Sequence, residues 1–446
     1  MKMNKFFVAA LAVTMALASC SKENGADKGK AGDGKETYAG VSITLPATTG
    51  TRALDPAAGI AGEKNVTTIG IYIVDVDNSR LDYDVLTVAD DFTKLGNVYT
   101  ATTAVKTVTG TKKVYVVANP TTNIQNKLAS SGATAMNAIP FQLPETDFLT
   151  GTITSMVMSG AYTATGGELE LDEVRTPTEA VDAGNLVDIT IGRNLSKAVV
   201  QEGPDYEVVG GTTTLTWTLV SKSNDAYLLP QSVGTLNRGT VPASALDPTT
   251  GPDDNYWGKF SGTVGSGYIG VLGQGNDAKT ATYAQSKYMF ENKPTDMYAG
   301  NTTAARIMGV FDPAVIYSNV TAAGDKTDVG GSFVAGTDFY RSTIDQSYWT
   351  LAGRNAAIAT SYLGHTADDF LQYTGGVGYY TIYVNDGASN IGVDRNSYYL
   401  MQINKVIGPG TPGEPGPLPP VQQDTNLGVN VTVLDWDFKK SEQDIN

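Results

Sequence analysis

The chain of 446 residues has one cysteine, one histidine and few basic residues for its length. A lone cysteine allows no internal disulfide, and one histidine with one cysteine supplies too few ligands for a zinc site, so we expect no metal and no cofactor. Residues 53–446 hold 24 of the 31 basic residues but 42 of the 46 acidic ones. Without a basic stripe to neutralise phosphates, nucleic-acid binding is disfavoured. No apolar run after the first twenty residues reaches membrane-spanning length.

The start of the chain has the pattern of a secretory signal peptide. Lys2 and Lys5 precede a short apolar run, which ends in the small residues of "LASC". This ending resembles the lipobox of bacterial lipoproteins, and the following "CSKE" resembles the signal that carries such proteins to the cell exterior. The resemblance implies that Cys20 is lipidated and anchors a precursor in the outer membrane. The alternative, a small buried cysteine, is disfavoured by this position.

The rest of the chain has the composition of an all-β protein. Runs such as "TTTLTWTLV" and "GYYTIYV" are separated by Gly, Pro and Asn at short intervals, which is typical of β-sandwiches. One short helix is expected over residues 123–132. Tyrosine occurs six times before residue 206 and 17 times from there on, which places a domain boundary at about this residue.

We expect the chain to have five segments. They are a signal peptide (1–19), a lipidated propeptide with a removable strand (20–52), two sandwich domains (53–205 and 206–407), and a Pro/Gly-rich linker with a last strand (408–446). The propeptide begins with a flexible tether that extends to about Thr37. The linker "GPGTPGEPGPLPP" contains six prolines and four glycines, so it is neither a helix nor a central strand. We expect it to hold the last strand away from the body of the protein.

Two short strands near the ends of the chain share one pattern. Each has three apolar side chains on one face and polar side chains on the other. The apolar residues are Val41, Ile43 and Leu45 in "VSITL" and Val429, Val431 and Val433 in "VNVTV", which Trp436 follows. Either strand could fill the same apolar groove in the same register.

A protease site follows the first of these strands. Arg52 lies in a loop of small residues, where a trypsin-like protease could cut and leave Ala53 as the new N-terminus. The cut would free the first strand and expose a groove with unpaired backbone groups. The last strand of a neighbour could refill this groove by β-strand addition, and head-to-tail repetition would give a filament. Two alternatives stay open: each strand belongs to its own domain, or another arginine, such as Arg80 or Arg175, is cut.

Several stretches resemble the fimbrillins that build type V pili, in particular those of the shaft of short fimbriae. They are the leader, "KKVYVVAN" (112–119), "GRNLSKAVV" (192–200) and "RNSYYLMQINKVIGPGTP" (395–412). The resemblance implies two transthyretin-like β-sandwich domains with a C-terminal donor-strand arm. It also implies lipidation at Cys20 and a cut by an arginine-specific protease between Arg52 and Ala53. The donor strand would contain Val429, Val431, Val433 and Trp436.

The same resemblance implies the location and partners of the protein. The precursor would be an outer-membrane lipoprotein, and the mature protein would form extracellular fimbriae that support adhesion. Its partners would be identical subunits, the anchor and tip proteins of the fimbria, and the protease.

Nothing in the sequence points firmly to an enzyme. His365, near Asp368 and Asp369, is expected in a surface loop and lacks a nucleophile elbow. Carboxylate pairs of a glycosidase leave no sequence signature, so an exported hydrolase stays an alternative. A group of tyrosines suits either cross-strand packing or stacking on sugar rings: Tyr373, Tyr379, Tyr380 and Tyr383. A monomeric surface lipoprotein that binds glycans is therefore the alternative function.

Two acidic segments resemble calcium loops only in part. Asp75, Asp77 and Ser79 alternate as calcium ligands do, but Arg80 stands where such a loop needs glycine and Leu86 where it needs glutamate. The end of a strand is the better interpretation. Residues 247–255 are better interpreted as a turn.

Overall fold

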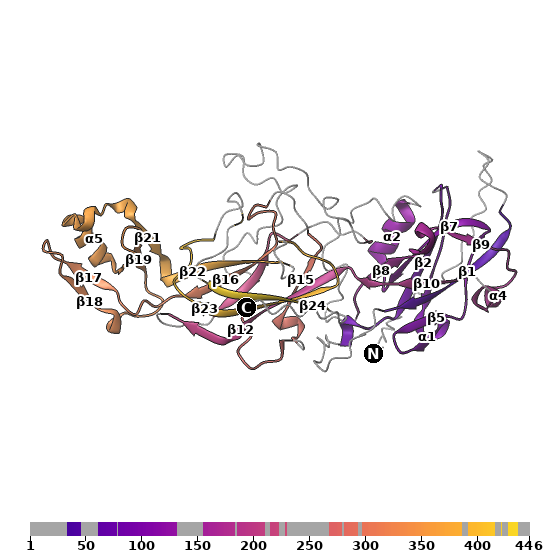
Figure 1. Cartoon of the computed structure of the whole chain (residues 1–446), viewed down its shortest axis with the longest axis horizontal. Helices are drawn as coiled ribbons and strands as arrows, with labels where there is room; N and C mark the ends of the chain where they lie inside the picture. Colours follow the sequence, from indigo (N-terminus) through magenta and orange to yellow (C-terminus); the bar gives the residue numbers. More distant parts are fainter. Residues whose placement is uncertain are drawn as a thin grey trace, which may run out of the picture. The chain divides into compact units, whose positions relative to one another are not determined.

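The computed structural model describes residues 34–45, 61–77, 79–131, 155–182, 185–209, 215–222, 228–229, 267–278, 281–292, 297–385, 391–414, 421 and 427–435. In these residues the chain consists mainly of β-strands, which form five sheets (Figure 1). The all-β fold of sandwich domains that the composition predicts is confirmed. Over the same residues, no helix combines the length and apolar character needed to cross a membrane.

Two sheets form the first sandwich. The first sheet has the order β10 (Leu186–Thr190), β1 (Glu36–Thr44), β5 (Val98–Ala101) and β4 (Phe92–Leu95), with β6 (Val105–Val108) also paired to β1. The second has the order β11 (Gly192–Arg193), β8 (Met158–Ala161), β7 (Gly110–Ala118), β2 (Thr68–Asp75) and β3 (Leu81–Thr87), with β9 (Leu169–Leu171) paired to β7. Alternating apolar side chains of both sheets point inward and share one core, which includes Ile43 of β1, Ile71 of β2 and Ile189 of β10.

The second sandwich also has two sheets. The first has the order β15 (Lys287–Phe290), β12 (Leu195–Val208), β23 (Ser397–Val406) and β24 (Leu427–Asp435). The second has the order β14 (Ile269–Gly270), β13 (Thr216–Val220), β16 (Ala304–Val310) and β22 (Val377–Tyr383). Trp217 of β13, Tyr380 of β22 and Met401 of β23 lie in the core between them. The boundary expected at residue 205 falls inside β12, whose partners, β15 and β23, both belong to this sandwich. The change in tyrosine content thus falls within a long strand rather than at a junction.

A fifth sheet, which the sequence did not predict, is made by residues 317–373. Its order is β18 (Lys326–Asp328), β17 (Tyr317–Val320), β20 (Tyr348–Trp349), β19 (Phe339–Ser342) and β21 (Phe370–Tyr373). Helix α5 (Leu351–Ala359) packs on it through Ala357, which shares a core with Trp349. The hydroxyl of Thr350 caps α5 by accepting a hydrogen bond from the Gly353 backbone N at 3.1 Å.

The other helices of the described residues are short. They are η1 (Ala61–Glu63), α1 (Val88–Asp91), α2 (Thr122–Ser131), η4 (Ala164–Gly167), α4 (Pro177–Asp182), η7 (Tyr283–Gln285), η8 (Gly330–Ser332), η9 (Tyr362–Gly364), η10 (Ala367–Asp369) and η11 (Thr374–Gly376). The helix expected over residues 123–132 corresponds to α2.

The first part of the linker is docked on the protein, contrary to the expectation of an arm held away from it. Thr411 and Tyr379 of β22 exchange two backbone hydrogen bonds of 2.9 Å, and the hydroxyl of Tyr380 donates to Gly408 O at 2.6 Å. This close approach requires a glycine in β22, since a Cβ on Gly378 would lie 1.7 Å from Pro409 O. The start of the linker is therefore bridged to β22, and β24 lies beside β23 (Figure 1).

Candidate functional site at the two terminal strands

The first of the described strands, β1, lies in the interior of its sheet. It is parallel to β10 over Gly40–Thr44 and antiparallel to β6 over Glu36–Ala39 and to β5 over Ser42–Thr44. β1 begins at Glu36 and therefore overlaps the end of the tether, which was expected to extend to about Thr37. Because it has partners on both sides, its removal would leave two rows of unpaired backbone groups facing one slot.

The inward face of β1 belongs to the core. Val41 and Ile43 are completely buried, as is Ala39, and Leu45 packs against the same core from the end of the strand. The structure thus brings together the three apolar residues predicted for the removable strand. Burial of a large apolar side chain contributes about 1.5–3 kcal/mol, so the slot without β1 would be a costly apolar trench.

A buried polar network holds the first half of β1, and sequence reasoning missed it. The hydroxyl of Thr37 donates to Asp172 O at 2.6 Å and accepts from Val174 N at 3.0 Å and Asn185 Nδ2 at 3.3 Å. The same amide of Asn185 donates to Tyr38 O at 2.9 Å. A threonine in a strand is too ordinary to signal such a role, and its partners lie far away in the sequence.

Ion pairs at the start of β1 are exposed. Lys35 Nζ lies 2.6 Å from Glu173, and this hydrogen bond raises the pKa of Lys35 and lowers that of Glu173. Glu36 pairs with Lys106 at 2.7 Å, which lowers the pKa of Glu36. Pairs of this kind contribute little because water and salt screen them. The ladders, the apolar face and Thr37 are therefore what hold β1.

Four of the predicted site residues lie outside the described residues: Cys20, Arg52, Ala53 and Trp436. In the sequence, Arg52 is the only arginine between β1 and β2. Arg80 lies in the turn between β2 and β3, with its Nε 2.7 Å from Asp82. Arg175 lies between β9 and α4. Only a cut between β1 and β2 would separate β1 from the rest of the chain, which favours Arg52.

The chain downstream of Arg52 is anchored by a buried ion pair. Glu63 of η1 is completely buried; its carboxylate lies 2.9 Å from Lys197 Nζ and accepts from the Tyr288 hydroxyl at 2.6 Å. Lys197 also donates to Ala281 O at 2.8 Å. Burial lowers the pKa of Lys197, and the Glu63 carboxylate opposes this change. The pKa of Tyr288 is raised, mainly by burial and in addition by the Glu63 carboxylate. These contacts tie η1 to β12 and β15.

Replacing Lys197 with methionine should destabilise the protein by about 3–5 kcal/mol, because it leaves the Glu63 carboxylate buried without its cation. The free energy of unfolding in urea would measure this loss. Adding Glu63→Gln to this variant should recover part of the stability, and Lys405→Met, which breaks an exposed pair with Glu207, should have little effect. Equal effects of Lys197→Met and Lys405→Met would contradict the anchoring role.

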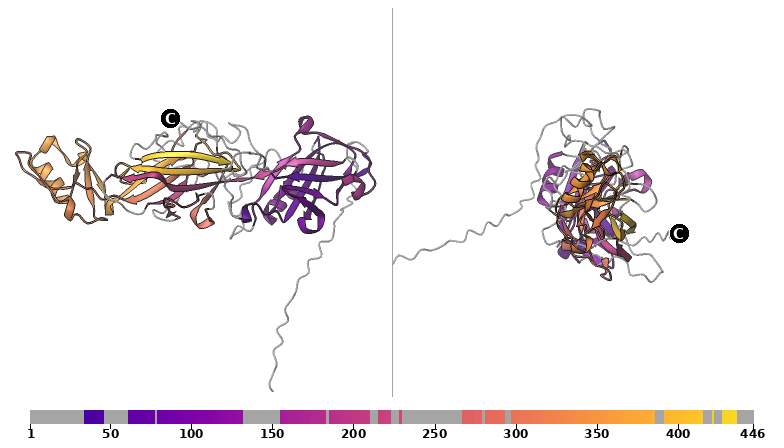
Figure 2. Two further views of the ribbon diagram at one scale, coloured as in Figure 1. Left: turned by 60° about the horizontal axis from the view of Figure 1, so that its bottom comes forward. Right: turned by 90° about the vertical axis from the view of Figure 1, so that its left-hand side faces the viewer.

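The last strand, β24, lies at the edge of its own sheet. It is antiparallel to β23, from Leu427 opposite Val406 to Asp435 opposite Ser397 (Figure 2). Among the described strands it pairs with β23 alone. Val429 and Val431 pack, partly buried, on the core of the second sandwich, and Val433 lies in the same strand opposite Tyr399. In the intact chain, each terminal strand is therefore part of its own domain.

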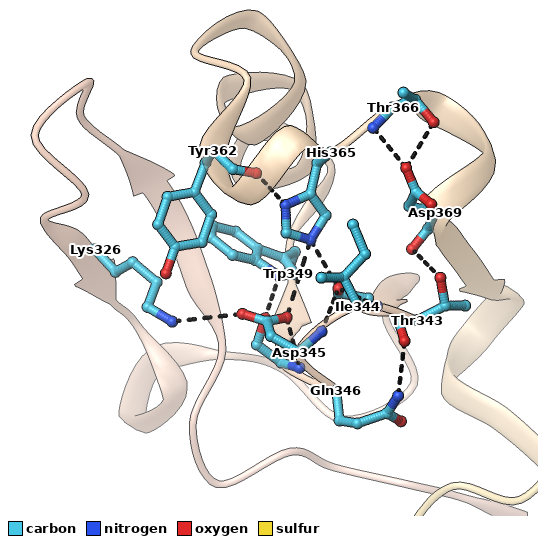
Figure 3. A network of polar contacts seen from close by, with 12 residues as sticks. Lys326, Thr343, Ile344, Asp345, Gln346, Trp349, Tyr362, His365, Thr366 and Asp369 are labelled. Carbon is cyan, nitrogen blue, oxygen red and sulfur yellow. Dashed lines mark hydrogen bonds and ion pairs between the residues drawn. The ribbon is translucent and has the colours of Figure 1, made fainter.

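The single histidine is buried, so the expectation of a surface-loop histidine is wrong. His365 Nε2 lies 2.7 Å from Ser342 Oγ, and its Nδ1 contacts Tyr362 O (Figure 3). Ser342 Oγ also accepts hydrogen bonds from the backbone N of Ile344 and Asp345. Because the serine is itself buried and fully engaged, this Ser–His contact serves packing under the aromatic rings and not nucleophilic attack.

Asp345 belongs to the same cluster. It lies 3.8 Å from Lys326 Nζ and 3.9 Å from His365 Nε2 (Figure 3). Burial raises the pKa of Asp345, but hydrogen bonds from Ser347 and Ser342 outweigh burial, so that the pKa is lowered. The carboxylate sits on the same nitrogen as the serine, whereas a catalytic triad needs it on the other.

The tyrosines and acidic residues considered as candidate ligands take part in the packing and hydrogen bonding of the fold. Tyr373, Tyr379 and Tyr380 are buried, and Tyr383 is half-buried, so most of this group is not available to stack on sugars. Asp75, at the end of β2, pairs with Lys112, and Asp77 accepts from Ser79 N at 2.9 Å, as expected for a strand end. The expected turn over residues 247–255 lies outside the described residues.

One family model matches the C-terminal part of the chain. Residues 371–442 match the family model described as the C-terminal region of fimbrillin, the major fimbrial subunit protein type IV. No curated protein matches the sequence. The tip fimbrial protein of Porphyromonas gingivalis, with C-terminal truncation, is 14% identical over 90% of this chain and 100% of that chain, with a TM-score of 0.39. A fimbrilin of Porphyromonas gingivalis is 15% identical over 90% of this chain and 98% of that chain, with a TM-score of 0.46.

The matched segment runs from the start of β21 through β22 and β23 and includes all of β24. It thus contains the linker docked on β22 and the last strand of the second sandwich. The resemblance to fimbrillins that the sequence predicts is confirmed for this C-terminal segment of the chain.

Proposed function

We propose that this protein is a structural subunit of a cell-surface fimbria and polymerises by exchange of its terminal strands. The observation that carries the proposal is the position of β1. This strand comes first among the described strands and lies inside a sheet. The segment that joins it to β2 contains a single arginine. A cut at Arg52 would therefore open a slot with two unpaired edges and an apolar floor.

The strand β24 is suited to fill this slot in a neighbouring subunit. In its own sheet it has one described ladder, to β23, and Val429 and Val431 are only partly buried. In the slot it would have two ladders, to β10 and to β5 with β6, and its valines would take the places of Val41, Ile43 and Leu45, of which the first two are fully buried. Each added hydrogen bond contributes about 0.5–1.5 kcal/mol, so the exchange favours the slot.

The order of events follows from these positions. The precursor is lipidated at Cys20 and held on the outer membrane while β1 completes its sheet. An arginine-specific protease then cuts between Arg52 and Ala53, and each processed subunit donates its last strand to the next. The contact is heterologous and leaves a donor at one end and a slot at the other, so it propagates as a filament between anchor and tip proteins.

We expect the mature protein to begin at Ala53. N-terminal sequencing of subunits extracted from the cell surface would show this residue, and unboiled extracts would give a ladder of high-mass species on a gel. Lipid on Cys20 in most extracted chains, together with a single band, would instead indicate a monomeric surface lipoprotein.

A further inference from the structure

We infer that the donor enters the neighbour's first sandwich in one register, with residues 424–433 in the place of residues 36–45; this inference rests on the proposed function. Aligned without a gap, "DTNLGVNVTV" matches "ETYAGVSITL" in charge, size and polarity along most of its length. The four identical pairs are Thr425 with Thr37, Gly428 with Gly40, Val429 with Val41, and Thr432 with Thr44. Two of these positions meet specific demands of the slot.

The first demand is for a glycine. A Cβ on Gly40 would lie 3.1 Å from Val181 Cγ2, which is closer than an ordinary contact, so a side chain at this position would crowd α4. Between residues 421 and 435 the donor segment has a single glycine, Gly428. Only one register places it at the position of Gly40.

The second demand is for a buried hydroxyl. Thr37 satisfies Val174 N, Asp172 O and the amide of Asn185, all through one oxygen. A donor without a hydroxyl here would leave these groups without that partner in a buried site. In the register that matches the glycines, the residue at this position is Thr425.

Other registers fail at both positions. A slip of one residue turns the valines to the wrong face. A slip of two residues in one direction puts Asn426 at the position of Gly40 and Gln423 at that of Thr37. In the other direction these residues are Asn430 and Leu427.

In the inferred register the apolar side chains also match, with Val431 for Ile43 and Val433 for Leu45. Leu427, which replaces the smaller Ala39, is the one apolar position where the donor needs more room.

Engineered disulfides would test the register without interference from native cysteines, because Cys20 is the only cysteine in the sequence and lies upstream of Arg52. Ser42 of β1 lies opposite Thr100 of β5, so in the inferred register Asn430 of the donor takes this place. Processed Asn430→Cys/Thr100→Cys subunits should give a disulfide ladder on boiled, non-reducing gels. Asn430→Cys with Val98→Cys or with Thr102→Cys should not, because diagonal neighbours are about 7–8 Å apart and too distant for a disulfide.

The outcomes separate the register from the proposed function. A ladder from either control pair, or filaments without any cross-link, would overturn the register while strand exchange stands. No filaments from the processed protein without engineered cysteines would overturn the proposed function itself.

The hydroxyl can be tested on its own. Thr425→Val keeps the shape of the side chain and should weaken assembly about tenfold or more, whereas Thr425→Ser should assemble nearly as well as the original protein. Equal assembly of all three proteins would overturn the role assigned to Thr425.

Discussion

Replacing Arg52 by alanine should give a folded, lipid-anchored monomer that forms no filaments. While β1 remains attached, it competes with any donor as part of the same chain. A covalent connection gives such a segment an effective concentration of the order of millimolar, which a donor on another molecule does not match. Electron microscopy of the cell surface and unboiled gels of surface extracts would measure the loss.

The control for this variant is Arg52→Lys. Lysine keeps the positive charge and the length of the side chain, yet an arginine-specific protease does not cut after it. Limited digestion with trypsin, which cuts after both residues, should restore filaments to Arg52→Lys and not to Arg52→Ala. Filaments formed by intact Arg52→Ala would show that β1 need not be released.

Cutting the chain changes the competition between β1 and the donor but does not by itself remove β1. The released propeptide still has its ladders, its buried apolar face and the Thr37 network. Its affinity for the slot should be similar to that of the donor, because the two segments are alike in sequence. The cut lets β1 be lost by dissociation from the body, and mass action then favours the donors on neighbouring subunits.

The faces of both terminal strands were predictable from the sequence, because alternation with a period of two is a local property. Val41 and Ile43 point into a core as expected, and so do Val429 and Val431. The partners of these strands were not predictable in the same way. β1 pairs with β10, which lies far downstream in the sequence, and no local pattern specifies a parallel partner at that distance.

The docking of the linker on β22 and the fifth sheet were both missed, for different reasons. Proline and glycine correctly exclude a helix or central strand over residues 408–414, but they do not show that the segment docks through hydroxyls such as that of Tyr380. The fifth sheet has strands of only two to four residues, too short for a clear alternation. Helix α5 did carry a signal, since Thr350 precedes an alanine-rich run.

Replacing Val431 by aspartate should abolish donation and leave the subunit folded and able to accept. At home, Val431 is only partly buried on an edge strand, so a carboxylate there can reach water. In the slot, the inferred register puts this residue in the place of the fully buried Ile43. An unpaired carboxylate in such a site costs several kcal/mol, and each ~1.4 kcal/mol is a factor of ten in affinity.

The matched control is Asn430→Asp, which adds the same charge one residue away on the opposite face and should reduce assembly far less. Mixing gives the sharper measurement, because Val431→Asp subunits still accept a donor from the original protein but cannot donate. In an equal mixture each such subunit should end the filament that it joins, so electron microscopy should show filaments of only a few subunits. Mixtures with Asn430→Asp should keep nearly normal lengths.

Removing residues 421–446 should act like Val431→Asp, because the truncated chain keeps its slot and loses only its donor. Normal filaments from Val431→Asp alone would show that β24 stays in its own sheet during assembly, and unfolding of the truncated chain would show that its own domain depends on it.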